Sequence, residues 1–98
     1  MKGSFLMPTI RGKSLKAVAY DISEGYLVVN PIFLKSLNDE SLTGIFQEIM
    51  RVQAEIRAEK FPHSDTQLIR KRNMRLQRLH QSLIVIKNFA RERRLMLV

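Results

Sequence analysis

The chain has 98 residues, which is enough for one domain, spanning 1–98, with one hydrophobic core. Apolar residues make up 45% of it, too many for a disordered protein. No apolar run reaches the roughly 18 residues that a membrane-spanning helix needs. The absence of cysteine excludes disulfides, thiolate metal sites and thiol nucleophiles. We therefore expect a small cytoplasmic domain without a cofactor.

The net charge of +8 is carried entirely by the second half of the chain. Residues 1–49 hold five basic and five acidic side chains, whereas residues 50–98 hold twelve basic and four acidic ones. Such an asymmetry favours a polyanionic partner, which can be nucleic acid, an anionic membrane surface or an acidic protein.

The N-terminal third is expected to form an irregular arm over 1–13, with a short strand near 5–7 or 9–10, and a β-hairpin over 14–30. Residues 15–20 give a plausible first strand, and residues 26–29 give a stronger one that is rich in β-branched and aromatic side chains. Gly25 can supply the positive φ that the hairpin loop requires. Because an isolated two-stranded hairpin is barely stable, this one must lie on a helix or pair with another chain.

Two helices are predicted within residues 31–60. Asn30 followed by Pro31 indicates the start of a short helix that reaches Leu37. Asn38 or Asp39 then caps a longer helix, roughly 39–60, in which Gly44 is a weak point or a place of close packing. The core-facing stripe of this helix is Leu42, Ile45, Ile49, Val52 and Ile56, widened by Phe46 and Met50.

A long basic helix is predicted within residues 64–95. Phe61-Pro62-His63 ends the preceding helix, and Ser64 with Gln67 has the spacing of a capping box. The stripe of the new helix is Ile69, Leu76, Leu79, Leu83, Ile86 and Ala90. Because the connection is short, the two long helices should form an antiparallel hairpin. The expected fold class is α+β: an N-terminal β-hairpin, a short helix and a long antiparallel helical hairpin.

Two apolar segments near the C-terminus predict self-association. Residues 83–86 are apolar on every face of the helix, and the chain ends in four apolar residues. We expect a homo-oligomer, for example a four-helix bundle made by two copies. The residues expected at this oligomer or partner interface are Leu83, Ile84, Val85, Ile86, Leu95 and Leu97.

The strongest functional signal is a run of cations without an acid in residues 70–80. An arginine-rich helix face can neutralise phosphates and release their counterions. The residues predicted to contact nucleic acid, DNA or RNA, are Arg70, Lys71, Arg72, Arg75 and Arg78, with Arg91, Arg93 and Arg94 as secondary contacts. The alternative interpretation is a solvated helix face that only keeps a small protein soluble.

Catalytic and metal-binding patterns are weak. The two histidines, His63 and His80, are too few for a zinc site, which needs three or four ligands. Residues 28–42 resemble the segment that precedes the HExxH helix of some zinc metallopeptidases. Residues 47–51, however, keep one glutamate, Glu48, and have neither histidine, so this set cannot hold zinc.

The sequence therefore predicts a non-enzymatic module that binds nucleic acid through an Arg/Lys-rich helix face. The alternative is a protein-interaction or adaptor module, in which the helical hairpin and the apolar C-terminus bind a partner and the charge only solvates.

Overall fold

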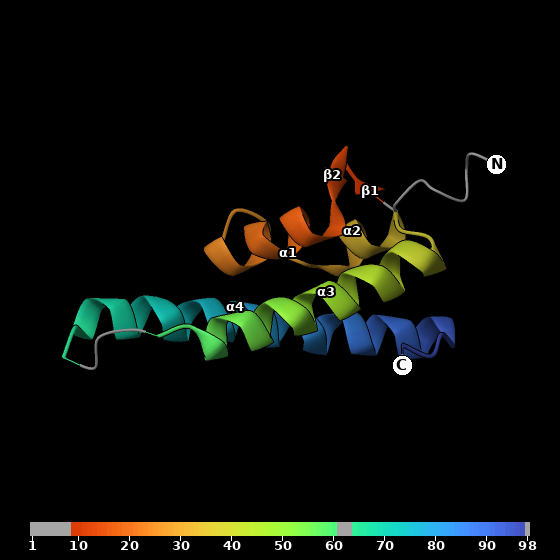
Figure 1. Ribbon diagram of the computed structural model, residues 1–98. Helices are drawn as coiled ribbons and strands as arrows, with labels where there is room; N and C mark the ends of the chain where they lie inside the picture. The colour runs from red at the N-terminus through yellow and green to blue at the C-terminus, as the bar shows by residue number, and fades with distance from the viewer. Residues whose placement is uncertain (1–8, 61–63, 98) are drawn as a thin grey trace.

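Four helices and one very short β-hairpin make up the residues that the computed structural model describes, 9–60 and 64–97 (Figure 1). The elements are β1 (Thr9–Ile10), β2 (Lys13–Ser14), α1 (Leu15–Glu24), α2 (Pro31–Lys35), α3 (Asp39–Ala58) and α4 (Thr66–Arg93). The possible strand at 5–7 and the turn at 61–63 lie outside these ranges. Within them, no helix has the length and hydropathy that a bilayer span requires.

The hairpin lies earlier in the chain, and is much shorter, than the sequence suggested. Strands β1 and β2 pair antiparallel, with Thr9 opposite Ser14 and Ile10 opposite Lys13. Both turn residues have positive φ, 54° at Arg11 and 78° at Gly12, as a two-residue turn of the primed type requires. The predicted strand at 9–10 is thus confirmed, although it lies within the expected irregular arm.

The predicted β-hairpin over 14–30 is wrong, because residues 15–24 form helix α1. The Ser14 side chain accepts a hydrogen bond from the Ala17 amide and caps the helix. The residues that α1 buries follow a helical rather than an alternating period, since Leu15, Val18, Ala19 and Ile22 share one face.

Gly25 does adopt the predicted positive φ, 84°, but it ends a helix instead of closing a hairpin. Its amide donates to the Ile22 carbonyl (3.1 Å), and the Tyr26 amide donates to the Asp21 carbonyl (2.9 Å). These are the two bonds of a Schellman motif. Residues 26–30 then lead to α2 without belonging to a helix or strand.

Helices α2 and α3 begin as predicted. The Asn30 side chain accepts from the Phe33 amide (2.9 Å), and the Asn38 side chain accepts from the Ser41 amide (2.8 Å). The predicted α3 stripe is confirmed by its five fully buried residues, Leu42, Ile45, Ile49, Val52 and Ile56. Met50 does not widen the stripe, because half of its side chain is exposed.

Helix α1 packs closely on α3 at Gly44. A Cβ atom at this position would lie 2.4 Å from Leu15 Cδ1, so the glycine allows the contact. Farther along, Tyr20 donates a hydrogen bond to Glu55, and Lys16 Nζ lies 3.5 Å from the same carboxylate. The hydrogen bond from Tyr20 lowers the pKa of Glu55.

Helix α4 runs in the opposite direction to α3, and α1 packs against both (Figure 1). Asp65, not Ser64, caps α4, with its side chain accepting from the Leu68 amide. The buried residues of α4 all lie in its C-terminal half: Leu79, Ser82, Leu83, Ile86 and Ala90. The core therefore lies where α1, α3 and this half of α4 meet.

The apolar residues 83–86, which were expected at an oligomer interface, differ in burial. Leu83 and Ile86 belong to the core of the chain itself. Val85, Leu95 and Leu97 pack against that core and are partly buried, whereas Ile84 is 47% exposed. A continuous 83–86 surface for a second copy is thus not present.

Candidate functional site

An open cleft of about 600 Å³ lies between the end of α1, the end of α3 and the N-terminal half of α4. It is lined by two acids, Glu24 and Glu59, by two apolar residues, Leu68 and Met74, and by five cations, Lys60, Lys71, Arg72, Arg75 and Arg78. With five positive and two negative side chains, the basic cleft has a formal charge of +3. Four of the five cations predicted from residues 70–78 are therefore brought to one concave site.

Arg75 holds both acids of the basic cleft. Its Nε lies 3.3 Å from Glu24 Oε2, and its Nη1 lies 3.6 Å from Glu59 Oε1. The carboxylates remain about half exposed, so each pair contributes little to stability. Both acids of the cleft therefore lie beside the same cation, and the cleft as a whole keeps its formal charge of +3.

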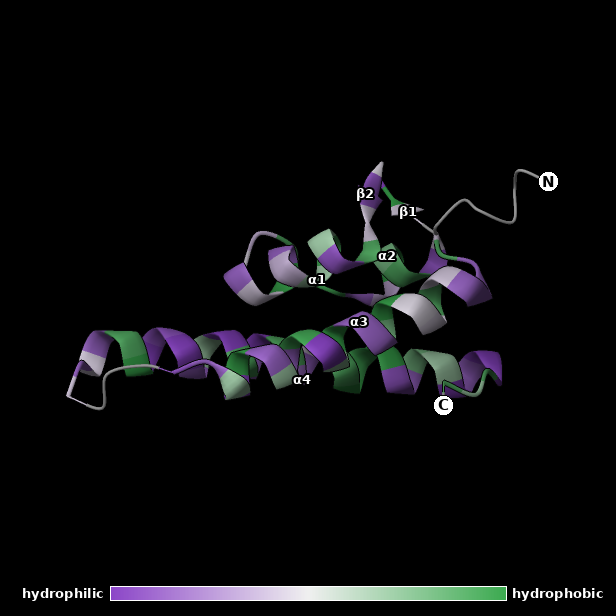
Figure 2. Ribbon diagram, viewed as in Figure 1, coloured by the Kyte–Doolittle hydropathy of each residue, from purple (hydrophilic) through white to green (hydrophobic). Residues whose placement is uncertain are grey.

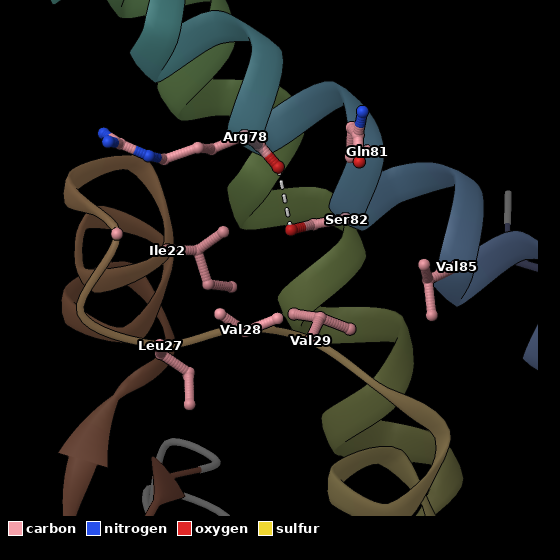
Figure 3. Close-up of a pocket in the computed structure, with 9 residues that line it drawn as sticks. Ile22, Leu27, Val28, Val29, Arg78, Gln81, Ser82 and Val85 are labelled. Atoms are coloured by element: carbon pink, nitrogen blue, oxygen red, sulfur yellow. Dashed lines mark hydrogen bonds between the residues drawn. The ribbon is translucent and has the colours of Figure 1, made fainter.

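Arg78 is tied to helix α1 and has a structural role. Its Nη1 donates to the Ser23 carbonyl (2.9 Å), one of the acceptors that the last turn of α1 leaves without a helical partner. The side chain also lies against Gly25, where an added Cβ would be 3.1 Å from Nε. Figure 3 shows this side chain extending from α4 toward the loop that ends α1. A cation at a helix C-terminus also interacts favourably with the helix dipole.

Arg72 and Arg75 continue the core-facing side of α4. Arg72, Leu79 and Ile86 follow one another at intervals of seven residues, and Arg75 precedes the buried Ser82 by the same interval. Residues seven apart share a helix face. The cations thus point into the cleft rather than away from the molecule, as their intermediate burial also indicates.

Arg70 and Lys71 are exposed and have no ion pair with any residue in the ranges 9–60 and 64–97. Lys71 lines the basic cleft, whereas Arg70 does not. These two cations are available to an external anion without breaking an interaction of the folded chain.

The secondary cluster at the end of α4 is separate from the basic cleft. Arg91 follows Arg78 by thirteen positions of helix, which is about 20 Å along the axis. Arg93 is engaged within the chain, because its Nη1 donates to the Leu37 carbonyl (2.9 Å) and to Asp39 (3.2 Å). Only Arg91 and Arg94 of this cluster are exposed.

Sequence reasoning missed three charged residues of the basic cleft: Lys60, Glu24 and Glu59. Lys60 and Glu59 follow α3, and Glu24 ends the helix that was expected to be a hairpin. No local pattern marks them, because they meet α4 only through the tertiary fold.

The histidines and the metallopeptidase-like segment supply no metal site in the described residues. No group of three potential ligands occurs there, and His80 is exposed on α4. His63 lies outside those ranges. Residues 28–30 are not a strand, although Glu48 does lie on helix α3.

Comparisons with known proteins give no relative from which a function could be transferred. No family model matches the chain, and neither the curated proteins nor the solved structures contain a significant match. What the basic cleft can bind has to be inferred from its own chemistry.

Proposed function

We propose that this protein is a non-enzymatic module that binds nucleic acid through the basic cleft. The observation that carries the proposal is the gathering of five cations from two parts of the chain in one open concave site. Charges that only solvate a helix are expected on its outward face. Here Arg72 and Arg75 lie instead on the continuation of the core-facing side.

The size and lining of the cleft suit a phosphate backbone. A volume of about 600 Å³ admits a chain segment rather than a lone ion. Lys71 and Lys60 are exposed at the cleft, and an arginine fork can bind a phosphate through two hydrogen bonds. The apolar side chains Leu68 and Met74 offer a surface on which a base can pack. Arg70, Arg91 and Arg94, exposed along the same helix, extend the positive field.

The test is fluorescence anisotropy with labelled single-stranded RNA, single-stranded DNA and duplex DNA, from low to physiological salt. The site variant is Lys60→Gln with Lys71→Gln, because both side chains line the cleft, are exposed and have no ion pair with any residue in the ranges 9–60 and 64–97. The matched control is Lys16→Gln with Lys35→Gln, which removes the same charge from exposed positions on α1 and α2.

We expect the site variant to bind about tenfold more weakly at physiological salt, equivalent to about 1.4 kcal/mol. The slope of log affinity against log salt should fall by about 2, because each of the two cations neutralises one phosphate in the wild type. The control should retain most of the affinity. Equal losses of affinity in both variants, or no binding of the wild type at physiological salt, would reject the basic cleft as a nucleic-acid site.

A protein-interaction module is the second candidate, and the apolar surface outside the cleft favours it. Ile84 is 47% exposed and Met96 is 83% exposed. An adaptor of this kind would form a complex insensitive to salt, and Ile84→Asp would weaken it without affecting binding of any nucleic acid.

A further inference from the structure

Residues 26–30 form a short extended segment between α1 and α2. Gly25, with φ 84°, ends the helix before it, and Pro31 begins the helix after it. Asn30 has extended backbone angles, φ −145° and ψ 167°. Figure 3 shows the chain passing from Leu27 to Val28 and Val29 without a helical turn. Five residues thus lie between two fixed ends.

The side chains of the extended segment alternate as they do in a strand. Val29 is buried and Leu27 is partly buried, whereas Tyr26 is 79% exposed and Val28 is 72% exposed. Alternation of this kind places one row of side chains on the core and the other in solvent. The sequence predicted a strand at 26–29, but these residues are extended without forming a strand, and the expected partner, residues 15–20, is a helix.

The backbone in the middle of the extended segment has no hydrogen-bond partner in the described part of the chain, although the Tyr26 amide donates to the Asp21 carbonyl and the Asn30 carbonyl accepts from the Leu34 amide. Within residues 9–60 and 64–97, neither the amides nor the carbonyls of Leu27, Val28 and Val29 make a hydrogen bond. A groove of about 280 Å³ runs beside the segment, with Val28 and Val29 on one side and Val85 of α4 on the other (Figure 3). Unpaired backbone groups in an extended, apolar stretch are a template for another strand.

The charge pattern favours a second copy of this chain as that strand. Residues 25–34 contain no charged side chain, the longest such run in the chain. Two molecules of net charge +8 repel each other over most of their surfaces, but the two paired stretches would carry no charge of their own. Of the cations that lie nearest to the segment, Lys13 is paired with Asp21 and Arg78 is bound to the Ser23 carbonyl. Lys35 follows the segment, whereas Asp21 and Glu24, which precede it, are paired with Lys13 and Arg75. Antiparallel pairing therefore brings Lys35 of one copy toward a region of the other in which the charges are already paired.

We propose that residues 26–30 pair antiparallel with the same residues of a second copy, with the two-fold axis at Val28. The axis is placed there because Val28 is the centre of the five extended residues. Tyr26 then lies opposite Asn30 of the other copy, and Leu27 lies opposite Val29. The pairing is self-complementary and closes after two subunits. It does not depend on nucleic-acid binding and replaces the 83–86 run as the surface for self-association.

The absence of cysteine from the chain allows a direct test of this register. In antiparallel strands, directly opposite Cα atoms are about 4.5 or 5.5 Å apart, which is within the range that a disulfide spans. Val28→Cys should form a linked dimer under mild oxidation, seen on a non-reducing gel. Met50→Cys, an exposed apolar position on α3, is the control and should stay largely unlinked. Mixing Tyr26→Cys with Asn30→Cys should give more linked dimer than either variant alone.

Sedimentation velocity tests the same surface without crosslinking. The wild type should be a dimer at micromolar concentration, and Val28→Lys, which places two like charges at the axis, should weaken dimerisation at least tenfold. Met50→Lys should leave it unchanged. Because Val28 is exposed, circular dichroism should show both variants folded. A monomeric wild type, or a dimer that persists in Val28→Lys, would overturn the proposal.

Discussion

The two halves of helix α4 are built for different tasks, although they are one continuous helix. The C-terminal half, 79–93, contributes five buried residues, and the N-terminal half, 66–78, contributes none. The N-terminal half carries five cations and no acid, whereas the C-terminal half carries three cations and one acid. In Figure 2, purple bands recur along the N-terminal half of α4.

This difference shows how a binding surface can be made by extending a helix beyond its core. Helix α3 has 20 residues, about 30 Å, and α4 has 28, about 42 Å. Arg72 lies on the same face of α4 as the buried residues Leu79 and Ile86. At the level of Arg72, however, α1 and α3 have ended, so this face lines the cleft instead of the core. Apolar packing in the C-terminal half fixes the helix, so that its N-terminal half can present charge with little loss of entropy.

The largest expected effect is a difference in stability between two Ile→Ala substitutions, one in each half of α4. Ile86→Ala removes a fully buried side chain, and we expect it to lower the free energy of unfolding by about 2–5 kcal/mol. Ile69→Ala, in the N-terminal half, changes a partly buried residue and should cost less than about 1 kcal/mol. Urea unfolding followed by circular dichroism measures both. Since the helix propensity changes equally, similar decreases in stability would mean that the two halves are packed alike.

The part of the fold that the sequence predicted well is the part where local and tertiary signals agree. The α3 stripe extends over many turns, and only a helix places Leu42 and Ile56 on one face. Residues 15–20, by contrast, are a short apolar stretch that fits a strand as well as a helix. The Ser14 cap and the Schellman bonds after Gly25 favoured the helix, and the sequence alone does not weigh them against strand propensity.

The sequence predicted which cations belong to the candidate site, but not how they are arranged in space. A count of charged residues does not distinguish Lys71 from Arg78. Only the fold shows that Lys71 is available to a ligand, whereas Arg78 binds the end of α1. The distinction depends on Ser23, 55 residues away in the chain, which no local pattern connects to α4.

The second expected effect is a smaller difference in stability, between alanine substitutions of two arginines in the N-terminal half of α4. Arg78→Ala removes a partly buried, charged hydrogen bond to the Ser23 carbonyl, and we expect a decrease of about 1–3 kcal/mol in the free energy of unfolding. Arg70→Ala, at an exposed position, should change stability by no more than about 0.5 kcal/mol. Thermal unfolding of the two variants tests this. If Arg78→Ala is as stable as Arg70→Ala, Arg78 is as free as Arg70 to bind an external anion.

The smallest effect concerns the end of the C-terminal half. Arg94 has φ 61° and ψ 38°, a left-handed conformation that strains most side chains but not glycine. The amide of Arg94 donates to the Arg91 carbonyl (3.0 Å), and the Leu95 amide donates to the Ala90 carbonyl (2.8 Å), so the conformation is held by hydrogen bonds. Arg94→Gly should therefore stabilise the protein by about 0.5–1 kcal/mol.

Arg91→Gly is the matched control for this change, because it makes the same substitution three residues earlier, inside the helix. There glycine should cost about 1 kcal/mol, since it loses more backbone entropy than arginine and gains nothing from its φ. The two variants carry equal charge, so their midpoints of thermal unfolding should move in opposite directions from the wild type. A downward shift in both would show that Arg94 is not strained, and that α4 ends by side-chain contacts rather than by its left-handed residue.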